Sequence, residues 1–364
     1  MATGMLNMQE LLLLMVEKNA SDLHITSGIP PMLRVDGELV PTQYEKLTPD
    51  ICQRLIYSLL TDTQKEKFEA NNELDLSFGI KGVGRVRMNV YRQRGTLGAA
   101  FRSIPNKIPT FDELGIPPVI YEVVKIPKGL ILVTGPTGSG KTTTLASMID
   151  FMNEHLQSHI MTIEDPIEYI HLHKKSVVNQ REVGTDTNSF PTALKYVLRQ
   201  DPDIILVGEM RDLDTIASAL TIAETGHLVF ATLHTTDAAS AVNRMIDVFP
   251  PHQQSQIRSQ LSFTLQAIFS QTLVAHSSGT GRVLAAEVLI VTPAIRNLVR
   301  DMKTEQIYLS MQTGGKFGMQ TLNMALANLY LRRQITYQEA LMHTTDAEDL
   351  KRLIQKENVS VPRT

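Results

Sequence analysis

The chain has 364 residues, of which 20% are charged, and its formal net charge is −3 at pH 7. This near-neutral balance lacks the strongly basic character of nucleic-acid-binding domains, so we expect no nucleic-acid partner. The single cysteine, Cys52, excludes an intrachain disulfide framework and a cysteine-rich zinc site, and it is typical of a reducing, cytoplasmic compartment. The longest early apolar run, Leu11 to Val16, is far shorter than the roughly 20 residues of a membrane-spanning helix, so we expect no direct membrane span.

The first hundred or so residues predict a small α+β domain. A helix is expected from Leu6 to Asn19, followed by short alternating strands between Ser21 and Val40. A second helix is expected from Pro49 to about Asn71, with Thr48 as its N-cap. Strand-like runs then follow around Leu74 to Phe78, Arg85 to Tyr91 and Ala99 to Ile104.

Prolines mark the next stretch as a boundary, at positions Pro105, Pro109, Pro117 and Pro118. We therefore predict an N-terminal domain over residues 1–105, a linker over residues 106–125 and a second domain over residues 126–364.

The second domain has the pattern of an α/β fold. Short, continuous apolar runs separated by helical segments are typical of strands buried on both faces of a parallel sheet. These runs are Gly129 to Thr134, Ile160 to Ile163, Asp203 to Val207 and Leu228 to Leu233. A wholly helical region is expected from Pro293 to Leu353.

A complete G-x-x-x-x-G-K-[ST] motif follows the first of these apolar runs and precedes a helical segment. Its residues are Gly135, Pro136, Thr137, Gly138, Ser139, Gly140, Lys141 and Thr142, with Thr143 next in the chain. Backbone N–H groups of such a loop wrap the phosphates of a nucleotide at a helix N-terminus. Lys141 can reach the β and γ phosphates, and the Thr142 hydroxyl can ligate Mg²⁺. The motif predicts a nucleotide site.

Two carboxylates stand at the carboxyl ends of predicted strands, where open α/β sheets bind their ligands. They are Glu164 and Glu209. One can polarise the attacking water while the other holds the hydration shell of the metal. The alternative interpretation is that either is a helix cap or an ion-pair partner. Asp203 precedes its apolar run and so lies at the wrong end for metal binding.

Other candidate residues have two open interpretations each. His234 follows an apolar run, where a γ-phosphate sensor would lie, but an isolated strand histidine is more often structural. Arg85 and Arg87 share one face of a predicted strand, with Arg102 in the next strand-like run. These arginines either form a solvated sheet edge or reach the nucleotide of a neighbouring subunit, a contact worth about 10³ or more in rate.

Several further segments match one known family. They are Ser21 to His24, Arg34 to Gly37, Thr162 to Glu168, Leu198 to Asp203, Gly208 to Asp212 and Thr225 to Thr235. Together with the phosphate-binding loop, they resemble the type II/IV secretion ATPase superfamily nearly end to end, and within it the pilus retraction ATPases. This resemblance implies a PAS-like N-terminal domain, a RecA-like ATPase domain with a helical C-terminal extension, and a homo-hexameric ring.

The resemblance also implies roles for individual residues. Glu164 and Glu209 would be the catalytic and magnesium-associated carboxylates, and His234 a phosphate sensor. Arginines 85, 87 and 102 fall in the segment that supplies phosphate-contacting arginines, and Arg199 matches another. Many relatives have an arginine where this chain has Lys195, which lacks the bidentate fork.

Two features favour retraction over pilus extension or type II secretion. The zinc-binding tetracysteine element of those relatives is missing, because the chain has one cysteine. The segment Ala294 to Asp301 closely resembles the AIRNLIRE motif that is associated with retraction. As a helix, it would carry Ile295, Leu298 and Val299 on one apolar face.

Together with the phosphate-binding loop, the resemblance implies an ATP- and Mg²⁺-dependent hexameric motor for type IV pilus retraction and twitching motility. The resemblance implies a cytoplasmic location at the inner face of the inner membrane and contact with the pilus platform protein. A retraction-accessory paralogue is an alternative function, and a paralogous ATPase is also a possible partner. A DNA-translocating ATPase and a non-enzymatic, nucleotide-gated scaffold are the remaining alternatives.

Overall fold

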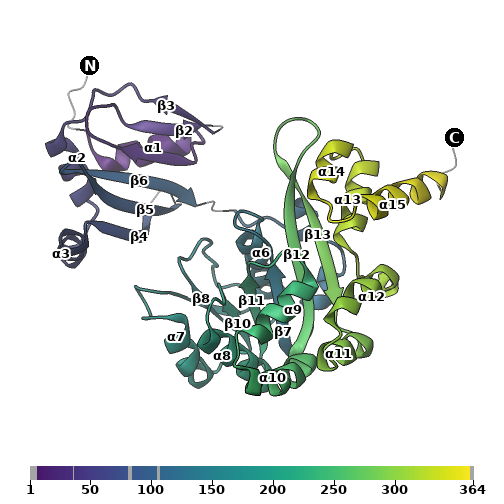
Figure 1. Cartoon of the computed structure of the whole chain (residues 1–364). Coiled ribbons are helices and arrows are strands. Elements are labelled where there is room, and N and C mark those ends of the chain that lie inside the picture. The colour runs from purple at the N-terminus through teal and green to yellow at the C-terminus, as the bar shows by residue number, and fades with distance from the viewer. Residues whose placement is uncertain (1–5, 36, 81–83, 105–106, 361–364) are drawn as a thin grey trace. The chain divides into compact units, whose positions relative to one another are not determined.

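The computed structural model describes residues 6–35, 37–80, 84–104 and 107–360. Asp36, in a segment that resembles the family, and Pro105, at the predicted domain boundary, lie outside these residues. The chain forms two compact units (Figure 1). One comprises the chain up to Lys107 together with Pro166–Ile170, and the other comprises Ile108–Asp165 and the chain from His171 onward.

The first unit is a six-stranded antiparallel sheet with the strand order β3-β2-β1-β6-β5-β4. Its elements are α1 (Met8–Glu17), β1 (Asp22–Ile25), β2 (Met32–Val35), β3 (Glu38–Pro41), α2 (Pro49–Tyr57), α3 (Asp62–Asn71), β4 (Glu73–Ile80), β5 (Gly84–Gln93) and β6 (Thr96–Ile104). The apolar faces of α1 and α2 and alternate strand residues form one hydrophobic core, which includes Leu12, Ile56, Met88 and Phe101. The α+β architecture expected for this part of the chain is confirmed.

The second predicted helix is wrong in its extent, because the structure divides it into α2 and α3. Thr48 is the N-cap of α2, as predicted. The break comes from a second capping signal: the Thr61 hydroxyl accepts the Gln64 N–H, and the Gln64 side chain accepts the Thr61 N–H. This capping box begins a new helix within the apolar-periodic stretch.

The second unit contains a seven-stranded sheet in the order β13-β12-β7-β11-β10-β8-β9. Its strands are β7 (Gly129–Thr134), β8 (His159–Glu164), β9 (Val177–Glu182), β10 (Ile204–Val207), β11 (Leu228–Leu233), β12 (Leu265–Ala275) and β13 (Arg282–Ile290). All pairs are parallel except β12 with β13. The four predicted strands are confirmed and buried on both faces.

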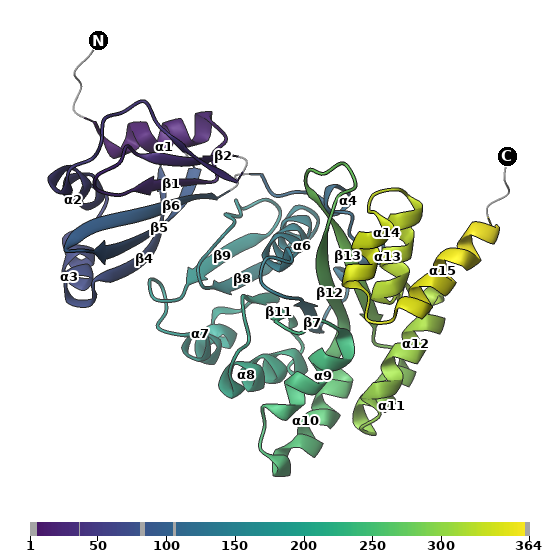
Figure 2. The same ribbon diagram turned by 45° about the horizontal axis from the view of Figure 1, so that its top comes forward.

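Helices cover both faces of this sheet (Figures 1 and 2). Helix α6 packs on one face, and α7 to α10 pack on the other. These helices are α6 (Lys141–His155), α7 (Phe190–Val197), α8 (Leu213–Glu224), α9 (Ala238–Asp247) and α10 (Pro251–Thr264). The stretch expected as a linker contains two short helices, α4 (Phe111–Leu114) and α5 (Ile120–Val123), whose buried residues join the core on the α6 side.

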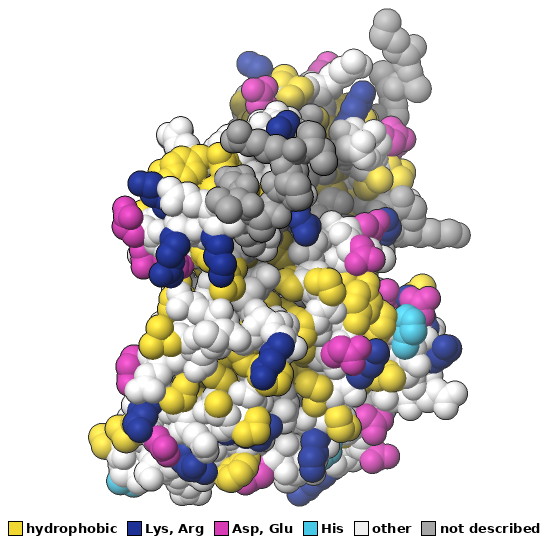
Figure 3. Space-filling view, turned by 90° about the vertical axis from the view of Figure 1, so that its right-hand side faces the viewer, with side chains coloured by type: hydrophobic (Ala, Val, Ile, Leu, Met, Phe, Trp, Pro, Cys, Tyr) yellow, Lys and Arg dark blue, Asp and Glu magenta, His cyan; other side chains and the backbone are white. Residues whose placement is uncertain are grey.

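The chain ends in a helical region, as predicted, with α11 (Pro293–Arg300), α12 (Ile307–Thr313), α13 (Leu322–Leu331), α14 (Tyr337–His343) and α15 (Ala347–Ser360). Ile295 and Val299 of α11 are buried, whereas Arg296 donates to the carbonyls of Ser262 and Phe263 at the end of α10. Figure 3 shows the face on which these helices lie in Figure 1, with basic, acidic and hydrophobic side chains mixed across it. Within the part of the chain that is described, no helix has the length and apolar character needed to cross a bilayer.

Three strands of the second sheet were not predicted. β9 is an edge strand that carries mostly polar residues, so it lacks the apolar run of a buried strand. β12 continues directly from α10 with no turn residue between them, and β13 pairs with it as an antiparallel hairpin.

Candidate active site

The phosphate-binding loop connects the carboxyl end of β7 to the N-terminus of α6. Gly140 is the N-cap of α6 and has a left-handed conformation, with a φ of 88° and no side-chain cap. The first backbone N–H groups of the helix therefore have no side-chain acceptor at the cap position. Together with the helix dipole, they form a site suited to an anionic phosphate group.

Gly135 is a position where only glycine fits. Its φ is 141°, and an added Cβ would lie 2.4 Å from the Gln271 carbonyl oxygen and 2.5 Å from the Ser139 hydroxyl. The loop backbone thus lies directly against β12. Gln271 also reaches α6, because its Nε2 donates to the Thr144 hydroxyl at 2.8 Å. Strand β12 therefore supports the backbone of the loop through Gln271.

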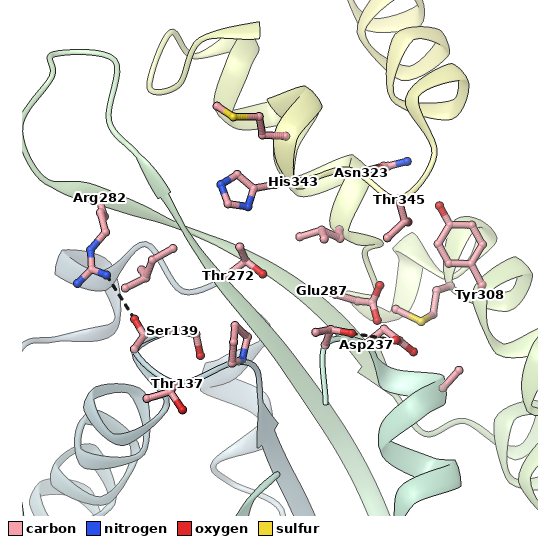
Figure 4. A pocket seen from close by; sticks show the side chains of 18 of the residues that line it. Thr137, Ser139, Asp237, Thr272, Arg282, Glu287, Tyr308, Asn323, His343 and Thr345 are labelled. Atoms are coloured by element: carbon pink, nitrogen blue, oxygen red, sulfur yellow. Dashed lines mark hydrogen bonds between the residues drawn. The ribbon is translucent and has the colours of Figure 1, made fainter. Parts of the chain in front are cut away.

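Two basic side chains donate hydrogen bonds to carbonyl oxygens of the loop. Lys141 Nζ donates to the carbonyl oxygens of Gly135 at 2.8 Å and Pro136 at 3.0 Å. Arg282 of β13 donates to the Gly138 carbonyl at 3.4 Å (Figure 4). Arg282 and Gln271 were not predicted, because their approach to the loop depends on the β12–β13 hairpin.

A cavity of about 610 Å³ lies beside the outer surface of the loop. Figure 4 shows Thr137 and Ser139 on one side of it, with Glu287, Tyr308 and Asn323 on another. Glu287 of β13 is 5% exposed, and it accepts the N–H of Ala238 at 2.8 Å. Burial raises the pKa of Glu287 to about 7, helped by the charge of Asp237 and opposed by backbone N–H groups.

The two predicted catalytic carboxylates end neighbouring strands. Glu164 is the last residue of β8 and is 6% exposed, and Glu209 follows β10. Gly208 keeps these strand ends close, because its N–H donates to the Ile163 carbonyl at 2.8 Å. An added Cβ at Gly208 would lie 3.2 Å from the Cα of Glu164.

Two polar side chains donate hydrogen bonds to one oxygen of Glu164. The Thr162 hydroxyl donates to Glu164 Oε1 at 2.7 Å, and Gln180 Nε2 of β9 donates to the same oxygen at 3.2 Å. Buried polar groups are normally hydrogen-bonded, and these donors satisfy the buried Glu164 oxygen. The site therefore contains a fixed, buried carboxylate at the carboxyl ends of the strands, where ligands bind in this type of fold.

Glu209 forms a small polar cluster with Arg211 of its own segment and with His234, which follows β11. His234 Nε2 lies 2.8 Å from Glu209 Oε1, and Arg211 donates to the same oxygen. Burial acts to raise the pKa of Glu209, but the hydrogen bonds and positive charges of Arg211 and His234 outweigh it and hold the pKa below its ordinary value. Glu209 is thus ionised at neutral pH, which suits a partner of a cation. Arg211 was not predicted.

The predicted arginines lie on different parts of the chain. Arg87 and Arg102 are directly opposite each other on β5 and β6 of the first unit. Acidic side chains partner both: Arg102 Nε lies 2.9 Å from Asp22 Oδ1, and Arg87 lies 3.9 Å from Asp75. Arg85, on the same strand as Arg87, donates to the Ser77 hydroxyl at 2.6 Å.

Arg199 belongs to the second unit, in a 3₁₀ turn after α7, and its guanidinium lies 5.8 Å from the centroid of the Tyr196 ring. Lys195 lies at the same distance from that ring. The two cations therefore share one aromatic support.

Among the described residues, no three histidine, cysteine or acidic side chains gather closely enough to hold a metal by themselves. The residues that fit Mg²⁺ are oxygen donors at the site, the Thr142 hydroxyl in the first turn of α6 and the ionised Glu209. This donor set suits a metal that keeps most of its waters and also binds phosphate.

A phosphate-binding loop after a central parallel strand, with carboxylates at the ends of two neighbouring strands, defines a P-loop protein of the RecA-like class. The sequence profile of the type II/IV secretion system protein family matches residues 6–341, and the chain belongs to that family.

Similar proteins agree with this assignment over nearly the whole chain. The type IV pilus retraction ATPase PilT of Pseudomonas aeruginosa is 51% identical over 335 residues, which cover 92% of this chain and 97% of that protein. The type IV pilus ATPase PilU of the same organism is 41% identical, over 95% of this chain and 91% of PilU. A crystal structure of the pilus retraction motor PilT with bound ADP matches with a TM-score of 0.91 at 50% identity, covering 95% of this chain and 99% of that one.

Proposed function

We propose that this chain is an ATP-hydrolysing motor that drives retraction of a type IV pilus. The observation that carries the proposal is that one sheet bears both a complete phosphate-binding loop and two carboxylates at the ends of adjacent strands. The chain is also 51% identical to a pilus retraction ATPase over 92% of its length. The loop supplies nucleotide binding and the carboxylates supply the chemistry of hydrolysis.

The nucleotide is proposed to be ATP, with its phosphates wrapped by the backbone of residues 135–140 and by the first turn of α6, which contains Lys141, Thr142 and Thr143. Lys141 would exchange its two loop carbonyls for phosphate oxygens. Thr142 and Glu209 would hold Mg²⁺, Glu209 through water. When bound, the metal neutralises charge that develops on the phosphate groups.

Residues of this chain then supply positioning and proton handling. Glu164, fixed by Thr162 and Gln180, would orient and polarise the attacking water. His234 would sense the γ-phosphate, because its hydrogen bond to Glu209 connects the end of β11 to the metal-binding side of the site. Arg85, Arg87, Arg102 and Arg199 are proposed to contact phosphates, some of them in a neighbouring subunit.

The motor is proposed to work as a homo-hexamer at the cytoplasmic face of the inner membrane. Hydrolysis would move residues 1–105 against residues 126–364, the proposed domains, through the connecting residues 106–125. That movement would displace the pilus platform protein, so that pilin subunits leave the base of the filament.

The test is to delete the gene in its host, and then to count surface pili and measure twitching in the same cells. Excess pili and no twitching are expected. The intact gene should restore the normal number of pili and twitching, whereas Glu209→Ala should restore neither. Cells without pili would contradict the proposal and indicate an extension ATPase. Unchanged pili would favour a retraction-accessory role, an alternative supported by the 41% identity to PilU.

In vitro, Glu209→Ala should abolish hydrolysis while ATP binding remains, because the residue lies outside the phosphate-binding loop. Unchanged turnover would contradict its assigned role.

A further inference from the structure

Gln180 lies next to Glu164 because of the register between β8 and β9. The parallel pairing places Thr162 opposite Gln180 and Glu164 opposite Glu182. Since side chains alternate between the two faces of a strand, Thr162, Glu164, Gln180 and Glu182 all share one face. Asn179 therefore lies on the other face of β9, where it is exposed and its amide contacts His159 Nε2 at 2.9 Å.

The side-chain amide of Gln180 is oriented by a donor at its far end. The backbone N–H of His171 donates to Gln180 Oε1 at 2.8 Å. An N–H group can only donate, so the oxygen of the amide must face His171. The amide nitrogen is then directed to Glu164, where it donates to Oε1 at 3.2 Å.

The segment that carries His171 is itself anchored to α6, the helix that begins at the phosphate-binding loop. Asn153 of α6 donates to the Leu172 carbonyl at 2.7 Å and accepts the Lys174 N–H at 3.0 Å. The His171 side chain is buried and lies 3.9 Å from Asp150 of the same helix. One rigid helix therefore positions both the phosphate-binding loop and, through His171 and Gln180, the Glu164 carboxylate.

We propose that Gln180 is a positioning residue for hydrolysis, which holds the Glu164 carboxylate at the angle needed to orient the attacking water. This inference rests on the proposed function of Glu164. Gln180 acts through Glu164. It belongs to β9, whereas the phosphate-binding loop follows β7, so its loss affects turnover and leaves nucleotide binding in place.

The experiment measures ATP hydrolysis and ATP binding by the full-length protein and four variants. Gln180→Met is close to isosteric and removes the amide hydrogen bonds to the His171 N–H and to Glu164. Gln180→Glu keeps an oxygen for the His171 N–H but replaces the donor to Glu164 with a second oxygen. Asn179→Asp makes the same amide-to-carboxylate change on the opposite face of β9, and Glu164→Gln is the reference for loss of the carboxylate.

We expect Gln180→Met and Gln180→Glu to lower kcat about tenfold or more, with KM and Kd for ATP within about twofold of the parent values. Asn179→Asp should keep parental kcat. Thermal unfolding of each variant shows whether it is folded, and if Gln180→Met does not fold, Gln180→Glu decides the question.

Two results would overturn the positioning role in an experiment where Glu164→Gln is inactive. One is a parental kcat in a folded Gln180 variant, and the other is an equal loss of kcat in Asn179→Asp. A folded Gln180 variant that loses ATP binding along with turnover would also overturn it. Full turnover by Glu164→Gln would be a different failure, since it would remove the catalytic assignment of Glu164 and the inference along with it.

Discussion

His234 Nε2 lies 2.8 Å from Glu209 Oε1, and this contact joins the ends of two neighbouring parallel strands. The preceding residues of β10 and β11 are paired in register, with Val207 opposite Ala231. The two side chains therefore meet just beyond the carboxyl ends of these strands. The phosphate-binding loop follows the carboxyl end of β7 in the same sheet. Arg211 completes the group on the same carboxylate oxygen.

The His234 contact should matter for turnover more than for binding. His234→Ala is expected to lower kcat for ATP hydrolysis about tenfold or more, because a charge-assisted hydrogen bond to Glu209 is lost. ATP affinity should change little. The matched control is His227→Ala at the opposite end of β11, where the imidazole bonds to Thr225 and the Ile222 carbonyl. Equal losses in the two variants would indicate a structural role for both histidines.

Arg211 should set the acid limit of activity. It helps to depress the pKa of Glu209 against the effect of burial, so the carboxylate stays charged to a lower pH than usual. In Arg211→Ala the pKa of Glu209 rises, and the acid limb of the kcat–pH profile should move to higher pH. Arg211→Lys keeps the positive charge and should move the limb less. An acid limb at the same pH in all three proteins would show that Glu209 ionisation does not limit turnover.

Glu287 should make stability fall as the pH rises. Its pKa is about 7 in the folded protein against an ordinary 4.5, so the folded state binds more protons than the unfolded state between these values. The associated stability is present below about pH 4.5 and lost as the pH rises through 7, a change on the order of 3 kcal/mol.

The measurement for Glu287 is the free energy of unfolding between pH 5 and about 8 in the parent protein and in Glu287→Gln. The parent should lose more stability over this range than the variant, which has no charge at the position. Identical pH dependence in the two proteins would contradict the burial effect on Glu287.

Gly208 should be intolerant of a side chain although its φ is not left-handed. A Cβ there would lie 3.1 Å from the Ile163 carbonyl oxygen and 3.2 Å from the Glu164 Cα, so β8 and β10 would have to separate. Gly208→Ala is expected to cost about 1 kcal/mol or more of stability and to lower turnover by displacing Glu164. Gly79→Ala, where a Cβ meets nothing within 4 Å, is the control and should cost little. Similar stability and activity in both variants would contradict the prediction.

The phosphate-binding loop, the four buried parallel strands and the α+β character of the first unit could be predicted because each is a local pattern. Glycine and lysine spacing defines the loop, and a run of apolar residues is enough to indicate a strand buried on both faces. The capping box at Thr61 is also a local signal, and it explains why the long helix expected from Pro49 divides in two.

Other parts of the site depend on contacts between distant segments. Gln180 lies on an edge strand that has no apolar run, and Gln271 and Arg282 reach the loop only because β12 and β13 form a hairpin beside β7. Their side chains look like ordinary polar residues in the sequence. Their importance comes from strand order and register, which no window of adjacent residues contains.

The sequence by itself determined the chemistry available to this protein: the loop for phosphates, the carboxylates Glu164 and Glu209, and His234. Only the tertiary structure decided how these groups support one another, with His234 and Arg211 on Glu209, and Thr162 and Gln180 on Glu164. The physical reason is that residue type sets what a side chain can donate, accept or ionise, whereas pKa and orientation depend on partners that folding brings within hydrogen-bond distance.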